Sequence, residues 1–506
     1  MRHIPTTMAT QHPDNASAPY WGTSPFISTL DEVEECQRVF SDLDCDEYMW
    51  DWEGKFVDEA VVDRLFNRYS SYFKKNQLGK NKFLTFRIPN ISQEAGFRLA
   101  RSYMSLITAA HTAVEHKVHT PPVFEMILPM TTDASQLLTI VQKYLSALRF
   151  EKALFEKTLM KPEHLELIPL IEGSVTLLQS RQILKDYIEG YEKLVGRKPR
   201  TLRPFIARSD PALDAGFLAA ILSARGAISE YYRFEEETGV RVFPIIGVGC
   251  LPFRGGLAPT SIEHFLKNYA GVRTVTIQSS FRYDYPRSQV QTALKKLQKE
   301  LPIRKPHLFS EKEILDITTL TKHFASFYRP IIQSLAPTIN DIARFIPSHR
   351  ERIQHTGHFG YSRKIGKKKT LVPRAITFVA AFTSLGIPPS LIGVGRGLKA
   401  LHTKSKRHFE NLHKYLPTLE LDLIKVGSYL NSENLKFLSR TNPAWKAIAQ
   451  DVLDIEDLLG KKLGPATPVE FIHRNLTSNI YHLWKQQKGM VTEEILRAAR
   501  VRRSLG

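Results

Sequence analysis

Eight short runs of strand-like composition alternate with helical stretches over residues 1–290, and this alternation restricts the fold more than any other feature of the 506-residue chain. The runs start roughly 30 to 45 residues apart, the length of a βα unit. They are Ile4–Gln11, Glu47–Trp52, Phe83–Arg87, Val123–Pro129, Leu165–Ile171, Thr201–Ala207, Val242–Val248 and Thr274–Gln278. Most are continuous apolar runs, typical of parallel strands covered on both faces. We therefore predict an α/β fold with a (β/α)8 TIM-type barrel, and a doubly wound open sheet is the alternative.

Helical periodicity, with apolar residues three and four positions apart, fills the stretches between these runs and dominates after residue 290. The predicted helices are Glu94–His116, Ala134–Thr158, Leu177–Leu194, Ala212–Glu237, Ser288–Glu300, Glu311–Leu335, Pro373–Ser384 and Pro417–Leu438. Two basic segments that contain glycine, Gly360–Lys369 and Gly393–Lys399, are expected to be loops. We expect a barrel over residues 1–290 and a large, mainly helical region over residues 291–506, folded as one integrated unit.

The net charge of +19 belongs entirely to the second part of the chain. Residues 291–506 hold 36 Lys+Arg and 17 Asp+Glu, whereas residues 1–290 hold 34 of each. Such an asymmetry fits a nucleic-acid partner, a site for small anions, or an ordinary solvated surface. The sequence contains no zinc-finger or RNA-recognition motif, so a basic nucleic-acid-binding protein remains the lesser alternative.

Cysteine usage and hydropathy favour a cytoplasmic protein. Cys36, Cys45 and Cys250 are few and lack metal-binding spacing, so we expect reduced thiols. No run of about 18 apolar residues predicts a membrane span. The N-terminus lacks the basic and then apolar pattern of a secretory signal, so we expect neither a membrane nor a secretory location.

Two carboxylates follow neighbouring predicted strands, Glu172 after the fifth and Asp210 after the sixth. In a barrel, the carboxyl ends of the strands meet at one mouth, so these side chains are expected on the same side of it. Two carboxylates, water and a substrate oxygen form the usual environment of Mg²⁺. The alternative is that both residues cap helices or form loop ion pairs. A glycosidase with paired carboxylates is also possible, but the abundance of arginines favours an anionic substrate.

Two further residues at strand ends allow a catalytic and a structural interpretation. His12 precedes Pro-Asp-Asn in a turn, where an imidazole can serve as a base or simply bond to the backbone. Arg254 precedes Gly255 and Gly256, and this pair indicates a loop free to fold over a ligand or a flexible linker.

Arginines in the helical region are candidate ligands for an anion. Arg363 lies in a basic segment, and Arg374 follows Pro373 in the first turn of an apolar helix. The planar guanidinium matches phosphate and carboxylate geometry. Lys367–Lys369 form either a solvated loop or a contact with a nucleic-acid backbone.

Six of these segments, in this order, resemble motifs of the archaeal-type phosphoenolpyruvate carboxylases, the short branch of that family. They are Thr10–Asn15, Leu170–Glu172, Ser209–Asp210 with Asp214–Gly216, Phe253–Pro259, Ser362–Arg363 and Pro373–Ile376. The resemblance implies a carboxy-lyase that converts phosphoenolpyruvate and bicarbonate into oxaloacetate and phosphate through carboxyphosphate and an enolate. It also implies Mg²⁺ or Mn²⁺, a homotetramer, and the supply of four-carbon acids to the tricarboxylic acid cycle by carbon dioxide fixation.

The resemblance assigns roles to individual residues of this chain. It implies metal ligation by Glu172 and Asp210, proton transfer by His12, and a lid that carries Arg254. The resemblance implies that Arg363 and Arg374 bind the anionic groups of the substrate, and that Arg374 is also a catalytic residue. Barrel residues 1–290 are thus expected to hold the metal and catalytic groups, and residues 291–506 the anion-binding arginines and oligomer contacts.

The sequence departs from the long enzymes of the family at two phosphate-binding segments. Their Asp-Ile-Arg-Gln-Glu-Ser segment is replaced here by Met126–Met130, and their His-Gly-Arg-Gly-Gly run by Gly247–Cys250. We therefore expect other substrate ligands at strand ends, namely Arg87, Arg208 and Gln278. Leu170 and Phe205 are candidates for a dry carbon dioxide pocket. Another Mg²⁺-dependent, enolate-forming barrel lyase is the alternative enzyme, and bicarbonate dependence would separate the two.

Overall fold

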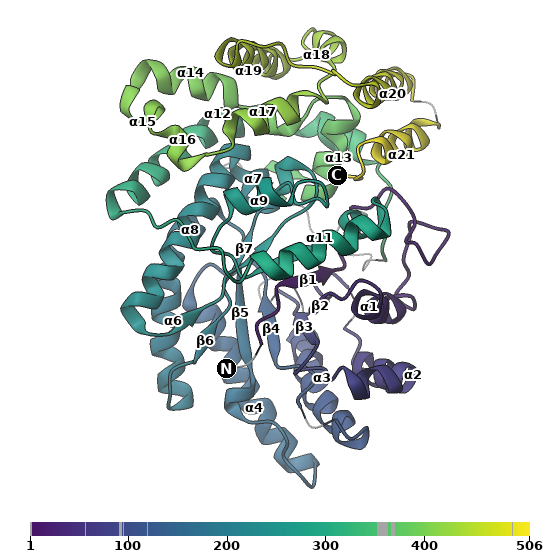
Figure 1. The fold of residues 1–506 in the computed structure, drawn as a ribbon, viewed down its shortest axis with the longest axis vertical. Coiled ribbons are helices and arrows are strands. Elements are labelled where there is room, and N and C mark those ends of the chain that lie inside the picture. The colour runs from purple at the N-terminus through teal and green to yellow at the C-terminus, as the bar shows by residue number, and fades with distance from the viewer. Residues whose placement is uncertain are drawn as a thin grey trace.

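A closed barrel of eight parallel strands forms the centre of the computed structural model (Figure 1). The structure describes residues 3–55, 57–90, 94, 96–118, 120–351, 363–365, 370–487 and 489–506. The barrel strands are β1 (Thr7–Thr10), β2 (Glu47–Asp51), β3 (Phe83–Arg87), β4 (Glu125–Leu128), β5 (Glu166–Ile171), β7 (Phe205–Ala207), β9 (Ile245–Gly247) and β10 (Thr274–Ile277). β10 pairs with β1 and closes the ring. The predicted (β/α)8 barrel is confirmed, and the open sheet is wrong.

Two predicted strands are each divided by a proline. The run Thr201–Ala207 consists of β6 (Thr201–Leu202) and β7, with Pro204 between them. The run Val242–Val248 similarly divides at Pro244 into β8 (Arg241–Val242) and β9. Proline has no N–H to donate to a strand ladder, so each strand is interrupted there. The outer pieces β6 and β8 pair with each other as a separate parallel sheet.

Helices surround the barrel and also follow several strands at its mouth. The surrounding helices are α1 (Glu32–Ser41), α2 (Val61–Lys75), α3 (Gly96–Glu115), α4 (Ala134–Leu154), α6 (Ser180–Val195), α8 (Phe217–Thr238), α9 (Ile262–Asn268) and α11 (Arg287–Glu300). Shorter helices α5 (Ser174–Leu178), α7 (Ser209–Ala215) and α10 (Ser279–Tyr283) follow β5, β7 and β10. The predicted helix Ala212–Glu237 is broken at Gly216, whose φ of +91° is disfavoured for other residues.

The second part of the chain lies over the mouth of the barrel (Figure 1). It contains the helices α12 (Glu311–Ala343), α13 (Ala375–Ser384), α14 (Val394–Lys404), α15 (Lys406–Glu410), α16 (Leu412–Tyr415), α17 (Leu419–Gly427), α18 (Ser432–Leu438), α19 (Pro443–Leu459), α20 (Pro468–Lys485) and α21 (Val491–Val501), with the hairpin β11 (Arg363–Ile365) and β12 (Thr370–Val372). The first of these helices packs along α8 and α7, and α13 contacts α7. The N-terminus of α12 is fixed by a capping box between Ser310 and Glu313.

Two expectations for this region are wrong. The segment Gly393–Lys399 is not a loop, because α14 begins directly after Gly393, which has a φ of +76°. The predicted helix Pro417–Leu438 is two helices, α17 and α18, separated by residues 428–431. The expected loop Gly360–Lys369 lies outside the described residues except for 363–365.

Three buried clusters form the hydrophobic core. The largest packs the barrel against its surrounding helices, and a small one fills the barrel interior with Met8, Met49, Ile127, Ile168, Leu170, Phe205, Ala207 and Ile245. The remaining cluster joins α7 and α8 with the helices after residue 310. The division at residue 290 therefore stays a prediction, since this last cluster draws on both sides of it.

The three cysteines are buried free thiols. Among the described residues, no single helix is both long and apolar enough to cross a membrane, and one bent pair, Ala375–Ser384 with Pro389–Lys404, meets both criteria together.

A buried ion cluster stabilises the end of the barrel opposite the mouth. Arg203 donates to Glu47 at 2.7 Å and to Glu125 at 2.7 Å, and to the hydroxyl of Thr274 at 3.0 Å. All four side chains are buried. Buried ions are tolerated when they are paired and hydrogen-bonded, so this arginine neutralises two carboxylates that would otherwise repel each other inside the barrel.

We predict that Arg203→Ala destabilises the fold by about 3–5 kcal/mol, because it removes the guanidinium that pairs with two buried carboxylates. Urea unfolding followed by circular dichroism measures the change. The control is Arg200→Ala, since Arg200 is exposed and only three positions away. Equal stability of the two variants would contradict a role for the cluster in folding.

Candidate active site

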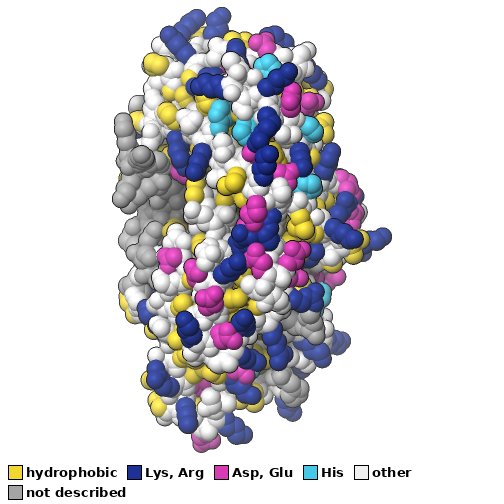
Figure 2. Space-filling view, turned by 90° about the vertical axis from the view of Figure 1, so that its left-hand side faces the viewer, with side chains coloured by type: hydrophobic (Ala, Val, Ile, Leu, Met, Phe, Trp, Pro, Cys, Tyr) yellow, Lys and Arg dark blue, Asp and Glu magenta, His cyan; other side chains and the backbone are white. Residues whose placement is uncertain are grey.

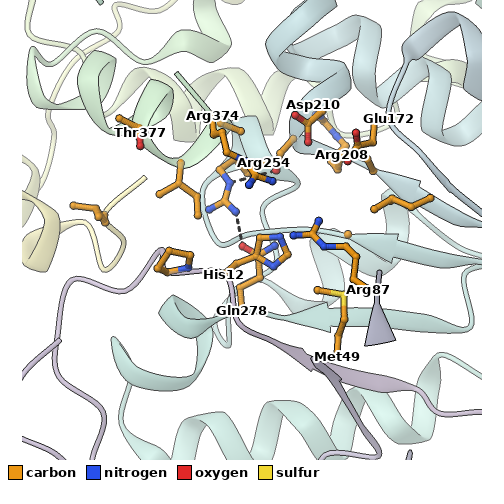
Figure 3. A pocket seen from close by; sticks show the side chains of 18 of the residues that line it. His12, Met49, Arg87, Glu172, Arg208, Asp210, Arg254, Gln278, Arg374 and Thr377 are labelled. Carbon is orange, nitrogen blue, oxygen red and sulfur yellow. Dashed lines mark hydrogen bonds between the residues drawn. The ribbon is translucent and has the colours of Figure 1, made fainter. Parts of the chain in front are cut away.

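A cavity of about 100 Å³ opens at the mouth of the barrel (Figure 3). Eight of the predicted site residues line it: His12, Arg87, Glu172, Arg208, Asp210, Arg254, Gln278 and Arg374. They come from the ends of five strands, from the segment after β9 and from the start of α13. The backbone of Arg363 lies in β11, but its side chain lies outside the described part of the structure. The structure therefore brings together residues that are up to 362 positions apart in the sequence.

Glu172 and Asp210 lie at the same side of the cavity (Figure 3). Glu172 directly follows β5, and Asp210 lies in the first turn of α7, after β7. These two strands are neighbours in the barrel, with Leu170 opposite Phe205. Within the described residues, no group of three or more His, Cys, Asp or Glu could hold a metal ion by itself. The donor set fits a hard cation that takes two carboxylates and completes its shell with water and substrate oxygens, as Mg²⁺ does.

A network of two carboxylates holds two arginines beside the cavity. Arg87 donates from Nε to Asp51 Oδ1 at 2.7 Å and from Nη2 to Oδ2 at 2.5 Å, and its Nη1 lies 3.1 Å from Glu53 Oε2. The same Glu53 oxygen accepts from Arg374 Nη2 at 3.3 Å. Burial alone would lower the pKa of Arg87, but Asp51 and Glu53 raise it above its ordinary value. Arg87 therefore stays charged beside the cavity.

Arg374 also has a buried N–H donor that remains open to a ligand. Its Nη1 is buried and has no hydrogen-bond partner among the described residues. A buried donor without an acceptor costs about 1–3 kcal/mol, so such groups are rare unless they serve a ligand. Arg374 is the N-cap of α13, whereas the sequence analysis placed it within the first turn of this helix. Helix N-termini favour anions, so this position also suits an anionic ligand.

Arg254 is fixed in the wall of the cavity by four partners. Its guanidinium donates to Asp14 Oδ2 at 2.9 Å, to the carbonyl oxygen of Gly506 at 2.6 Å, to Ser209 Oγ at 3.3 Å and to Gln278 Oε1. The residue is 1% exposed. We expected a loop free to fold over a ligand, but here the segment is packed in place. Gly255, with a φ of +115°, allows the tight turn, because a Cβ there would lie 2.4 Å from Val248.

Arg208 reaches the cavity, but protein acceptors engage its guanidinium. It donates to the hydroxyl of Tyr269 at 2.9 Å and to the carbonyl oxygens of Phe253 and Phe217, each at 3.3 Å. The guanidinium carbon also lies 5.5 Å from the centre of the Phe217 ring. These contacts favour a positioning role for Arg208 over the substrate contact expected from the sequence.

His12 is held in the cavity as a neutral imidazole. Its Nδ1 lies 2.8 Å from the hydroxyl of Thr10. Burial, and then the positive charge of Arg87, lower the pKa of His12 well below 6.5, against the opposing effect of Asp51. The ring is therefore uncharged near neutral pH and can accept a proton.

Comparison with known proteins assigns the chain to a family. Residues 4–506 match the sequence profile of the family described as phosphoenolpyruvate carboxylase. The chain belongs to the phosphoenolpyruvate carboxylase family. The carboxylase of Leuconostoc mesenteroides is 37% identical over 100% of this chain and 99% of its own length. That of Metallosphaera sedula is 38% identical over 100% of both chains, and that of Pyrococcus horikoshii is 38% identical over 83% of this chain and 87% of its own.

Among solved structures, a malate synthase of Haloferax volcanii in a pyruvate and acetyl-CoA complex aligns with 83% of this chain and 98% of its own. Its sequence identity is 10% and its TM-score 0.39, a likeness too low to bear on function. The archaeal-type branch of the phosphoenolpyruvate carboxylase family, expected from the motifs, is thus confirmed by sequence relatives and not by structural ones.

The sequence analysis missed a contribution from residues 504–506 to this carboxylase-family site. Leu505 lines the cavity and donates its backbone N–H to the carbonyl oxygen of Asp14 at 2.7 Å. The carbonyl oxygen of Gly506 accepts from Arg254. The sequence shows only a basic helix and a tail here, so it offers no signal of this contact. The pairing of Asp51 and Glu53 with the arginines was also missed.

Gly506 has no room for a side chain, because a Cβ would lie 2.0 Å from the carbonyl oxygen of Ile376 and 2.8 Å from the nitrogen of Ala380. We predict that Gly506→Ala displaces Arg254 and lowers the kcat of the family's reaction about 10- to 100-fold, since a misplacement of 1 Å is enough for such a loss. Steady-state kinetics measure the effect.

The control for this prediction is Gly489→Ala, because a Cβ there has nothing within 4 Å. Both variants should keep the melting temperature of the parent protein within a few degrees. A kcat for Gly506→Ala equal to that of the control would show that the contact with Arg254 does not matter for the reaction.

Proposed function

We propose that this chain catalyses the carboxylation of phosphoenolpyruvate by bicarbonate to oxaloacetate and phosphate. The observation that carries the proposal is the cavity itself, which combines two carboxylates, the guanidinium groups of Arg87 and Arg374, and a neutral histidine. Carboxylates suit a divalent cation and guanidinium groups suit phosphate and carboxylate, so the arrangement fits an anionic substrate bound together with a metal.

Glu172 and Asp210 would hold Mg²⁺, with Mn²⁺ as a substitute. When bound, the ion supplies positive charge that stabilises the phosphate group and the enolate oxygen. Arg374 would donate its open N–H to a substrate oxygen, and Arg87 would add charge from the same wall. We also propose Arg363 as a phosphate ligand, in keeping with its position in the hairpin that precedes α13.

In the first step, the residues proposed above to bind the substrate would hold its phosphate group for attack. A bicarbonate oxygen attacks the phosphorus atom of phosphoenolpyruvate, the P–O bond to the enol carbon breaks, and carboxyphosphate and the enolate of pyruvate result. Arg254 and Gln278, hydrogen-bonded to each other, shape the wall beside His12, and Arg254 belongs to the catalytic set as proposed from the sequence. Arg208, also proposed as a substrate ligand, would support this wall through Tyr269.

His12 would act in the second step. The neutral imidazole takes the proton of carboxyphosphate, which then divides into carbon dioxide and phosphate. The enolate carbon attacks carbon dioxide and forms oxaloacetate. Met49, Leu170, Phe205 and Ala207 line the cavity with apolar surface, which suits carbon dioxide and keeps water from protonating the enolate to pyruvate.

We further propose a cytoplasmic homotetramer without nucleic-acid or membrane partners. The support is the family to which the chain belongs and its buried free thiols.

An oxaloacetate assay linked to malate dehydrogenase tests the proposed reaction. NADH oxidation should require phosphoenolpyruvate, bicarbonate and Mg²⁺ together, and Asp210→Asn should lose at least about 100-fold in kcat, because one of two metal ligands loses its charge. Glu189→Gln is the matched control, since Glu189 is exposed and remote from the cavity. Turnover of phosphoenolpyruvate without bicarbonate would instead favour the alternative enolate-forming lyase.

The pH dependence tests the role of His12. A base must be unprotonated, and the pKa of His12 lies below 6.5, so kcat/KM should be constant above pH 6.5 and fall only as the pH drops through the lowered pKa. His12→Asn should lose about 10²- to 10⁴-fold in the pH range where the parent kcat/KM is constant, and it should lack this acid limb. The exposed His402, replaced by Asn, serves as control. An acid limb that survives in His12→Asn would assign it to another group.

A further inference from the structure

His349 is a buried histidine in the wall of the substrate cavity. It lies in the segment between α12 and β11, and it is 3% exposed. Neither ring nitrogen makes a full hydrogen bond to a described residue. Figure 2 shows histidines at the surface among lysines and arginines, where water can satisfy their ring nitrogens, whereas His349 is enclosed by the protein. A buried polar side chain without partners is rare unless it serves a ligand.

The backbone around His349 is fixed on both sides. The carbonyl oxygen of His349 accepts from the N–H of Ile27 at 3.1 Å. The next residue, Arg350, donates to the two carboxylate oxygens of Glu35 at 2.7 and 2.8 Å and to Glu32 at 3.1 Å. All three charged side chains are buried. A side chain whose supports are locked in this way is held in position for a ligand.

The imidazole of His349 is neutral and has one open nitrogen. Burial lowers the pKa of His349 to about 4, the backbone of Asn15 opposes this shift, and the charge of Arg350 adds to it. A carbonyl oxygen raises the pKa of an imidazole and a backbone N–H lowers it, so the ring N–H lies toward the carbonyl oxygen of Asn15. The other nitrogen therefore offers its lone pair to a donor in the cavity.

A lone pair in this cavity selects a ligand that has a proton to donate. The arginines of the site are donors only, so they suit the oxygens of phosphate and carboxylate. Near neutral pH, phosphoenolpyruvate has largely lost its acidic protons and offers only acceptors. Bicarbonate keeps one O–H group at this pH. Of the two substrates of the proposed reaction, bicarbonate is therefore the one that matches the open nitrogen of His349.

We propose that His349 is a bicarbonate-binding residue, which accepts a hydrogen bond from the O–H group of this substrate. The inference rests on the carboxylation reaction proposed above and adds a ligand for its second substrate. With the O–H group held by His349, the charged oxygen of bicarbonate remains available for attack on the phosphorus atom. The contact also favours bicarbonate over anions of similar size that lack a proton.

His349 and His12 lie close to each other but have different surroundings. The backbone of Asn15 beside His349 belongs to the turn that begins at His12. In this turn the N–H of Asp14 donates to the carbonyl oxygen of His12 at 3.0 Å. Asp51 raises the pKa of His12, whereas the described groups that act on the pKa of His349 include no carboxylate. The proton of carboxyphosphate therefore goes to His12, and His349 holds bicarbonate without becoming charged.

Steady-state kinetics with bicarbonate as the varied substrate test this role in the full-length protein. His349→Leu removes the acceptor, so the KM for bicarbonate should rise at least about tenfold, while the KM for phosphoenolpyruvate should stay within about twofold of the parent value. His402→Leu, a change at an exposed histidine that does not line the cavity, is the control and should leave both constants within about twofold. An unchanged KM for bicarbonate, or an equal rise in both constants, would overturn the proposal.

Two further measurements separate the lost contact from misfolding of His349→Leu. Formate has a carboxylate but no O–H group, so its inhibition constant against bicarbonate should change by less than about twofold in this variant. A rise for formate as large as that for bicarbonate would contradict a role of the O–H group. His349→Gln and His349→Asn keep an amide oxygen that can accept from bicarbonate, and one of them should recover at least about threefold of the lost affinity. Recovery in neither variant would also contradict the contact.

The parent protein distinguishes failure of this inference from failure of the proposed reaction. If the parent forms oxaloacetate only with bicarbonate, and His349→Leu has the same KM for bicarbonate, the carboxylation stands and the role of His349 is wrong. If the parent consumes phosphoenolpyruvate without bicarbonate, both the carboxylation and the role of His349 are wrong.

Discussion

Ion pairing at Glu53 and Asp14 is the interaction on which the site depends. Glu53, in the segment after β2, accepts from Arg87 of the barrel and from Arg374 of α13. Asp14, after β1, pairs with Arg254 after β9 and also meets residues 504 and 505 through its carbonyl oxygen. These contacts join the barrel mouth to the helices above it, so neither part of the chain forms the cavity alone. Carboxylates in this position orient several guanidinium groups without cancelling their use for an anion, because each arginine carries more donors than one carboxylate can accept.

Much of the fold followed from the sequence because the barrel strands are short, apolar and regularly spaced. The strand Phe83–Arg87 was predicted at its observed bounds, since it is apolar and flanked by polar residues. The strands that contain Pro204 and Pro244 were predicted as single runs because their composition is continuous, whereas hydrogen bonding interrupts them. The helix α14 was missed because its glycines, Gly395 and Gly397, suggest a loop, but tight packing requires them: a Cβ on Gly395 would lie 2.0 Å from a carbonyl oxygen of Asp451.

The candidate site was predictable where chemistry depends on residue type at a strand end, as for Glu172, Asp210 and Arg87. The hydrogen-bond partners of these side chains could not be predicted, because they depend on how far each side chain extends across the mouth of the barrel. Arg87 and Arg208 look equivalent in the sequence, each at the end of a strand, yet one lies among carboxylates of the cavity and the other donates to Tyr269 and two carbonyl oxygens. The packed position of Arg254 could not be predicted from the sequence either, because Gly255 and Gly256 are equally compatible with a mobile loop and with a tight turn.

The reactivity of the three buried thiols can report when the structure around them opens to solvent. Burial raises the pKa of Cys45 to about 12 and those of Cys36 and Cys250 well above 9. The thiolate is the reactive form, so alkylating reagents should scarcely modify the closed protein. Cys250 lies in the segment between β9 and Arg254, while the other two lie around α1 and β2. Differences in labelling rate between these positions would therefore separate local movement of the cavity wall from global unfolding of the barrel.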